Sequence, residues 1–132
     1  MADPWSAATP DDLSVPDSAP APDAVVGGSP AEAGAWPQVA ALAYGSGDGF
    51  VACTGVLIHA EWVLTAGHCA PDPTWIFLDS VDTEAPVAIH EVDETYIYPD
   101  ATFSFDVALN HLTTPSDLEP VPLALDLSLI HI

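Results

Sequence analysis

Trp62-Val63-Leu64-Thr65-Ala66-Gly67-His68-Cys69 is the most informative stretch of the chain, because an apolar run gives way there to small residues, a histidine and a cysteine. The apolar run is typical of a strand, and the small residues after it allow a tight turn. Such a turn would leave His68 room to face a cleft, where imidazole is the side chain best suited to general acid–base chemistry near neutral pH. Taken alone, a histidine beside a cysteine is more often structural, so these residues leave both roles open.

The chain on both sides of this stretch consists of short apolar runs separated by turn residues, a pattern that predicts an all-β domain. We expect strands over residues 38–44, 50–59, 62–66, 75–78, 88–98 and 107–112. Helical periodicity is weak, and the 14 prolines of the chain argue against long helices. Six strands of modest length suit a small antiparallel barrel or a sandwich.

Composition divides the chain near Val25-Val26-Gly27-Gly28. Residues 1–24 are rich in Ala, Pro and Asp and hold almost no bulky apolar side chains, so they cannot bury enough surface to offset the entropy of ordering. We expect this segment to be a flexible leader or propeptide. No signal peptide is visible, and no stretch of the chain is long and apolar enough to span a bilayer.

The charge balance is extreme, with 20 acidic residues, no Lys or Arg, and a net charge of −20 with histidine neutral. Such a chain cannot neutralise phosphates, which argues against nucleic acid as a partner. The same charge argues against attraction to an anionic membrane surface. Within the chain, a carboxylate can pair only with a histidine or the amino terminus.

The two cysteines, Cys53 and Cys69, allow one disulfide and an oxidising compartment. Two buried thiols are the alternative, and the spacing alone does not decide between them.

Five motifs in the same order and at similar spacing give the chain a family resemblance. The motifs are Val25-Val26-Gly27-Gly28, Trp36-Pro37, Cys53-Thr54-Gly55-Val56-Leu57-Ile58, Trp62–Cys69 and Phe105-Asp106-Val107-Ala108-Leu109. With these motifs the sequence resembles the trypsin/chymotrypsin-like serine peptidases (the S1 family), and the resemblance covers Val25 to about Leu125. The resemblance implies that residues 25–117 form an antiparallel six-stranded β-barrel, the first of the two barrels of the trypsin-like fold. Residues 118–132 would then begin the connector to a second barrel that is missing here.

The resemblance also implies roles for individual residues. His68 falls on the family's general base, and Asp106 on the carboxylate that orients it. Cys53 and Cys69 fall on the cysteine pair that the family bridges beside its histidine. Val25 falls on the residue that becomes the mature N-terminus when the zymogen is cleaved. An aspartate that leads an apolar strand is costly to bury unless a partner satisfies it, and His68 is the natural partner of Asp106.

Departures from the family pattern limit what the resemblance implies. Ala24 precedes Val25, where trypsin-activated zymogens carry Arg or Lys, and Gly67 stands in place of an alanine. No Gly-Asp-Ser-Gly-Gly occurs in the chain. We therefore expect no nucleophile in these residues, and a fragment of a serine endopeptidase that is inactive alone.

The remaining expectations concern ligands, partners and location. We expect no cofactor and no metal, since the other histidines lack metal-ligand spacing. Calcium stays an alternative at the acidic loop of Asp79, Asp82 and Glu84. The expected partners are a protein or peptide substrate and the missing C-terminal barrel, and the family implies a secreted or periplasmic location. A non-catalytic, protease-like binding module is the alternative function.

Overall fold

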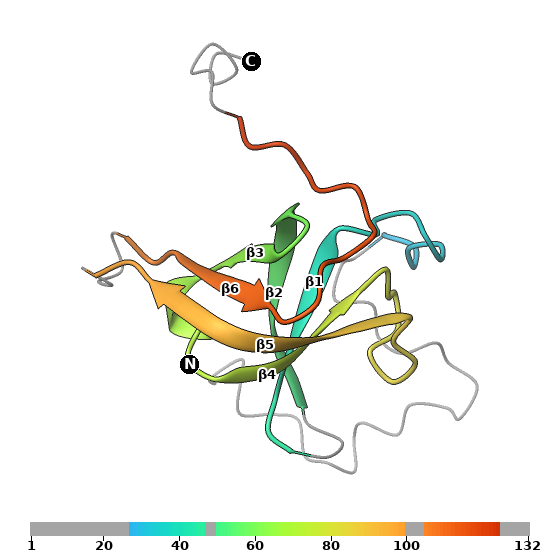
Figure 1. Ribbon diagram of the computed structural model, residues 1–132. Coiled ribbons are helices and arrows are strands. Elements are labelled where there is room, and N and C mark those ends of the chain that lie inside the picture. The colour runs from blue at the N-terminus through green and yellow to red at the C-terminus, as the bar shows by residue number, and fades with distance from the viewer. Residues whose placement is uncertain (1–26, 47–49, 100–104, 125–132) are drawn as a thin grey trace, which may run out of the picture. The chain divides into compact units, whose positions relative to one another are not determined.

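Six strands pair antiparallel and close into a barrel in the computed structural model, which describes residues 27–46, 50–99 and 105–124 (Figure 1). The 3₁₀-helix η2 (Gly67–Cys69) lies between the third and fourth strands. The expected leader over residues 1–24, Val25 and the end of the expected connector lie outside the described residues, so the domain boundaries stay predictions. The strands are β1 (Val39–Tyr44), β2 (Phe50–His59), β3 (Trp62–Thr65), β4 (Pro73–Leu78), β5 (Ala88–Ile97) and β6 (Ala108–Leu112).

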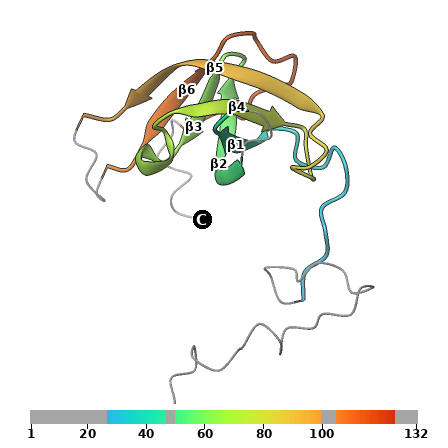
Figure 2. The ribbon, with the colours of Figure 1, turned by 90° about the horizontal axis from the view of Figure 1, so that it is seen from below.

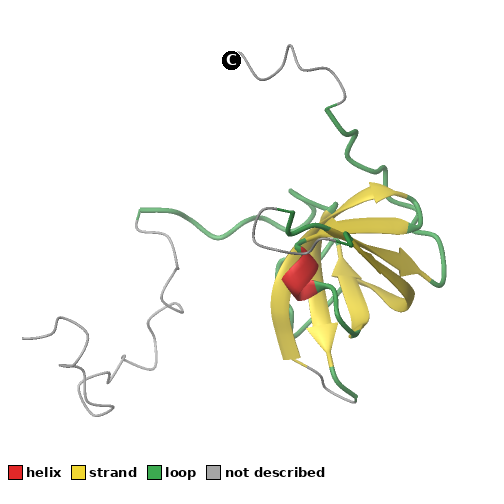
Figure 3. Cartoon of the chain, turned by 90° about the vertical axis from the view of Figure 1, so that its left-hand side faces the viewer, coloured by secondary structure: helices red, strands yellow, loops and turns green. Residues whose placement is uncertain are grey.

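The order around the barrel is β1-β2-β3-β6-β5-β4, and β4 pairs with β1 to close the sheet. The strands curve around a common interior (Figure 2), and the short helical turn η2 lies among them (Figure 3). Within the described ranges, no helix is long and apolar enough to cross a membrane. The predicted all-β fold and six-stranded antiparallel barrel are confirmed, and the sandwich is excluded.

The predicted strands agree with the structure to within two residues at each end. β4 differs most, because it begins at Pro73 rather than at Trp75. Proline lacks a backbone N–H, but it is tolerated at the first residue of a strand. Pro73 is therefore the first residue of β4 and not part of the turn before the strand.

Alternation along the strands sorts side chains between the barrel interior and its outer surface. In β6, Ala108, Asn110 and Leu112 are buried, whereas Leu109 and His111 between them are partly exposed. Side chains, not solvent, fill the interior, as in other small barrels. The fully buried apolar core residues are Ala40, Leu42, Leu57, Val63, Ala70, Ile76, Leu78 and Leu112.

Gly55 is required where β2 and β3 approach each other most closely. A Cβ atom at this position would lie 2.7 Å from Cγ1 of Val63 and 2.8 Å from the backbone oxygen of Leu64. Both distances are shorter than van der Waals contact, and the Leu64 oxygen belongs to the sheet backbone and cannot move aside easily. The close packing of β2 against β3 thus explains why the motif at Cys53–Ile58 has glycine at position 55.

Replacing Gly55 by alanine should lower the free energy of unfolding by about 1–3 kcal/mol, because the added methyl group overpacks the β2–β3 contact. Urea unfolding followed by tryptophan fluorescence measures the change. Ala52→Val is the matched control, since it adds bulk to the same strand at an exposed position. Equal unfolding midpoints for the Gly55→Ala variant and the parent chain would show that the barrel has room there.

Candidate active site

The turn that carries His68 begins where β3 ends. Thr65 closes β3 and its Oγ1 donates to the backbone oxygen of Thr54 on β2 at 2.9 Å. Ala66 keeps an extended conformation, and the backbone N–H of Cys69 then donates to the Ala66 carbonyl at 3.0 Å. This short 3₁₀ turn directs the His68 side chain outward, where 72% of its surface is exposed.

The register of β3 and β6 brings Asp106 to this turn. Thr65 is paired with Ala108, so the end of β3 lies beside the start of β6. His68 follows Thr65 by three residues and Asp106 precedes Ala108 by two. Residues 38 positions apart in sequence therefore meet at one edge of the barrel.

Asp106 contacts His68 through both of its carboxylate oxygens. Oδ2 lies 2.5 Å from Nδ1 of the imidazole, and Oδ1 accepts the backbone N–H of His68 at 2.7 Å. The first contact aims the ring and the second fixes the peptide that carries it. The structure brings together the two residues that the sequence singled out for catalysis.

The His68 contacts also set the charge of Asp106. The hydrogen bond with the His68 ring lowers the pKa of the Asp106 carboxyl below its ordinary value, and the backbone N–H of His68 lowers it further. Partial burial acts in the opposite direction and does not prevail. An ionised carboxylate only accepts hydrogen bonds, so the neutral imidazole must carry its proton on Nδ1. Nε2 then keeps the lone pair with which a base takes a proton.

Gly67 leaves space for the Asp106 carboxylate. A Cβ atom on Gly67 would lie 2.9 Å from Oδ1 of Asp106 and 3.3 Å from the backbone nitrogen of Val107. In the sequence, this glycine was notable only as a departure from the family's alanine. In this chain, an alanine would require the carboxylate to shift.

A disulfide ties the turn to the neighbouring strand. Cys53 on β2 and Cys69 at the end of η2 are bonded, with their Cα atoms 6.0 Å apart. Among the described residues, the group with metal-ligand geometry is Cys53, His68 and Cys69. Because the two sulfurs are bonded to each other, they offer no thiolate to a metal ion.

The acidic loop considered for calcium lies between β4 and β5. Oδ1 of Asp82 accepts the backbone N–H of Glu84 at 2.9 Å, which closes a local Asx turn. Asp79 adopts a left-handed conformation with φ of 53°. These features explain the loop as a turn, and calcium stays untested.

A second histidine–carboxylate pair lies on the outer surface of the barrel. Nδ1 of His111 on β6 lies 2.6 Å from Oδ1 of Asp93 on β5, and its Nε2 lies 3.9 Å from Glu61 at the turn after β2. The Trp62 ring packs edge-on against the imidazole, with ring centroids 4.6 Å apart. The hydrogen bond with Asp93 raises the pKa of His111, with further raising from the Asp93 and Glu61 charges, although partial burial opposes it.

Two more histidines make local contacts, and the fifth is not described. Nδ1 of His59 accepts the backbone N–H of Glu61 at 3.3 Å. Nδ1 of His90 lies 3.1 Å from the Thr114 carbonyl oxygen. His131 lies outside the described residues.

The sequence and the fold are those of a known family. The chain belongs to the trypsin family, whose model, described as Trypsin, matches residues 25–128. Mouse serine protease 56 is 38% identical over 100 residues, which are 69% of this chain and 16% of that protein. Mouse serine protease 28 is 30% identical over 131 residues, with 81% of this chain and 45% of that protein covered.

The solved structures agree on the fold. A structure described as HL collagenase superposes with a TM-score of 0.66 at 24% identity, over 80% of this chain and 50% of that one. At that identity the likeness concerns the fold alone. The chain spans less than half the length of each of the two mouse relatives.

Replacing both Cys53 and Cys69 by serine should lower the free energy of unfolding by about 3 kcal/mol, since the bond joins residues 16 positions apart and restrains the loop between them in the unfolded chain. Urea unfolding of the double variant beside the oxidised parent gives the value. The parent treated with a thiol reductant is the control and should lose a similar amount. An unchanged midpoint in the double variant would contradict a structural role for the bond.

His111→Gln should flatten the pH dependence of the free energy of unfolding above about pH 6.5. The folded chain binds the His111 proton more tightly than the unfolded chain. This contribution is therefore complete below about pH 6.5 and is lost as the pH rises through the raised pKa. Urea unfolding at pH 5.5 and at pH 8.5 measures the slope. His90→Gln is the control, since its ring contacts a carbonyl rather than a carboxylate, and identical slopes in all three proteins would contradict the account.

Proposed function

We propose that this chain supplies the general base and the orienting carboxylate of a serine endopeptidase. His68 is the base and Asp106 is the carboxylate. The contact of both Asp106 oxygens with His68, at 2.5 Å to the ring and 2.7 Å to the backbone, is the observation that carries the proposal. Membership of the trypsin family supports it, and a peptide substrate follows from that membership.

The proposed reaction is acyl transfer. A serine hydroxyl attacks the carbonyl carbon of the scissile peptide bond while Nε2 of His68 accepts the hydroxyl proton. Asp106 stabilises the imidazolium that forms, and it keeps the second proton on Nδ1. His68 then gives the accepted proton to the leaving amine, and water releases the acyl group by the same steps in reverse order. Every proton that leaves the serine or the water thus passes through Nε2.

The nucleophile would come from a second barrel. The 132 residues contain no Gly-Asp-Ser-Gly-Gly, and we propose that these residues alone hydrolyse no peptide bond. The oxyanion hole and the pocket that selects the substrate side chain would belong to the same second barrel. Substrate preference would therefore be decided outside this chain.

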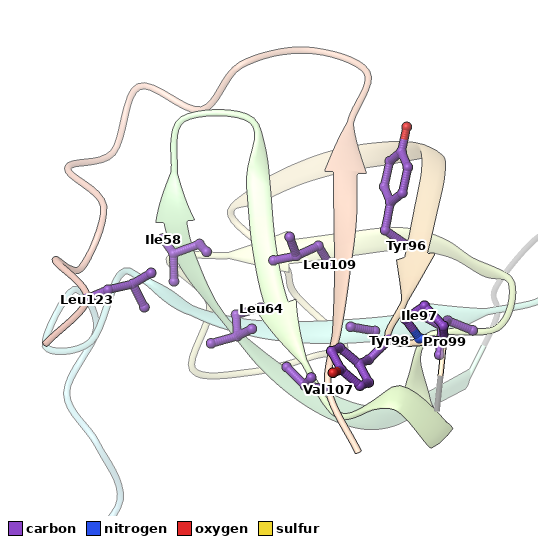
Figure 4. A pocket seen from close by; sticks show the side chains of 10 residues that line it. Ile58, Leu64, Tyr96, Ile97, Tyr98, Pro99, Val107, Leu109 and Leu123 are labelled. Atoms are coloured by element: carbon purple, nitrogen blue, oxygen red, sulfur yellow. The ribbon is translucent and has the colours of Figure 1, made fainter. Parts of the chain in front are cut away.

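An apolar groove on the outer surface of the barrel supports docking of such a second barrel (Figure 4). The groove has a volume of about 490 Å³ and reaches Val107, the residue after Asp106. An exposed apolar surface of this kind can mark a site of contact with another domain. Its lining includes Ile58, Leu64, Ile97, Val107, Leu109 and Leu123.

Secretion and activation by cleavage complete the proposal. The Cys53–Cys69 disulfide fits an oxidising compartment outside the cytosol. Cleavage after Ala24 would free the amino group of Val25, which calls for a processing enzyme that accepts a small residue before the cleaved bond.

Asp106→Asn in this chain joined to a Gly-Asp-Ser-Gly-Gly-bearing second barrel should lower kcat for peptide hydrolysis by about 10⁴-fold, because the amide favours the wrong tautomer of His68. His68→Ala should lose at least as much. Asp93→Asn is the matched control, because it breaks the other histidine–aspartate pair and should keep the parent kcat. Steady-state kinetics on a chromogenic peptide gives the values.

Two outcomes would count against the proposal. Full activity in the Asp106→Asn variant would remove Asp106 from the mechanism. Binding of peptides by the joined protein without turnover, and without labelling by an organophosphate, would favour the non-catalytic binding module.

A further inference from the structure

Tyr44, the last residue of β1, reaches the turn that carries His68. Its hydroxyl donates a hydrogen bond to the backbone oxygen of Cys69, the residue after His68, although the two lie 25 positions apart in sequence. We infer that Tyr44 is a positioning residue for His68, holding the C-terminal end of the η2 turn so that the imidazole stays in register with Asp106. The inference rests on the proposed function, since it assigns a residue to the support of the same base.

The Tyr44 side chain is aimed at the turn by the strands on both sides of it. Pairing of β1 with β2 shifts register between Leu42 and Ala43, and pairing with β4 shifts between Ala43 and Tyr44. Such irregularities redirect a side chain locally. The Phe50 ring stacks on the Tyr44 ring, with centroids 5.7 Å apart and planes inclined by 29°. The register shifts and the Phe50 ring therefore restrain the orientation of the Tyr44 ring independently of its contact with the turn.

The η2 turn is too short to hold itself in place. It contains three residues, and its own backbone supplies the bonds from Cys69 to Ala66 and from Ala70 to Gly67. Outside contacts restrain the rest. Asp106 accepts the N–H of His68, and Tyr44 donates to the carbonyl of Cys69. The peptide unit that enters His68 and the one that leaves Cys69 are thus each tied to a different part of the barrel.

Removing the Tyr44 hydroxyl would leave the backbone oxygen of Cys69 without this hydrogen-bond donor. Cys69 is buried, with 7% of its surface exposed, and its bond with Tyr44 is partly buried, so loss of the donor favours a rearrangement of the local backbone. The disulfide restrains the Cys69 side chain and makes no contact with its carbonyl oxygen. Burial also raises the pKa of the Tyr44 hydroxyl, so it stays a neutral donor throughout the pH range in which His68 would act.

The test compares Tyr44→Phe with Tyr96→Phe in the 132-residue chain by long-range ¹H–¹⁵N NMR, which reports the nitrogen that carries the proton of the neutral His68 ring. Tyr96 is the matched control, because its hydroxyl donates to Glu94 at 2.9 Å on the outer surface. In Tyr44→Phe, the ratio of the Nδ1–H to the Nε2–H form should fall by about two- to tenfold, the equilibrium equivalent of one lost hydrogen bond. In Tyr96→Phe, the ratio should equal that of the parent.

The outcomes separate this inference from the function on which it rests. If the ratio of the Nδ1–H to the Nε2–H form in Tyr44→Phe equals that of the parent and only the unfolding midpoint falls, Tyr44 stabilises the fold without positioning His68. That result would overturn the inference and leave the His68–Asp106 pair intact. A parent chain whose neutral His68 carries its proton mainly on Nε2 would overturn the proposed function and this inference with it. Tyr44→Phe keeps the aromatic ring that stacks on Phe50, so the variant retains the contacts that fold this end of the barrel.

Discussion

The pairing of Thr65 with Ala108 in the β3–β6 ladder is the constraint on which the rest of the site depends. It brings the end of one strand and the beginning of another to the same edge of the barrel. The short segments beyond that edge then carry His68 and Asp106 to within 2.5 Å of each other. A slip of one residue would exchange the inner and outer faces of β6 and expose Leu112, so burial of the core also protects the geometry of the site.

Because the chain has no Lys or Arg, histidine is the only side chain that can carry a positive charge and pair with a carboxylate. Among the described residues, each ion-pair contact between side chains joins a histidine to a carboxylate. The two principal pairs differ in their setting. His111 lies against Trp62 with 22% of its side chain exposed, whereas His68 is 72% exposed. The first setting favours a fixed surface contact, and the second leaves the far ring nitrogen open to an approaching group.

Much of this arrangement could be predicted from the sequence, for identifiable reasons. Alternating and apolar runs placed the six strands, because burial in a barrel repeats with the two-residue period of a strand. The order of the motifs led to the barrel, to His68 and to Asp106, which no local pattern would have selected among 20 acidic residues. Tyr44 was missed, because its contact depends on two register shifts that have no signature in the sequence. The space that Gly67 leaves for the Asp106 carboxylate was missed for a similar reason, since it arises only when both turns are placed together.

The central claim is that Asp106 holds the neutral His68 ring with its proton on Nδ1. The most direct measurement is a long-range ¹H–¹⁵N spectrum of the parent chain recorded on the alkaline side of the His68 titration. The account predicts cross-peaks of a protonated Nδ1 and an unprotonated Nε2. A spectrum dominated by the Nε2–H form would contradict it, because an ionised carboxylate at Nδ1 accepts a hydrogen bond and cannot donate one.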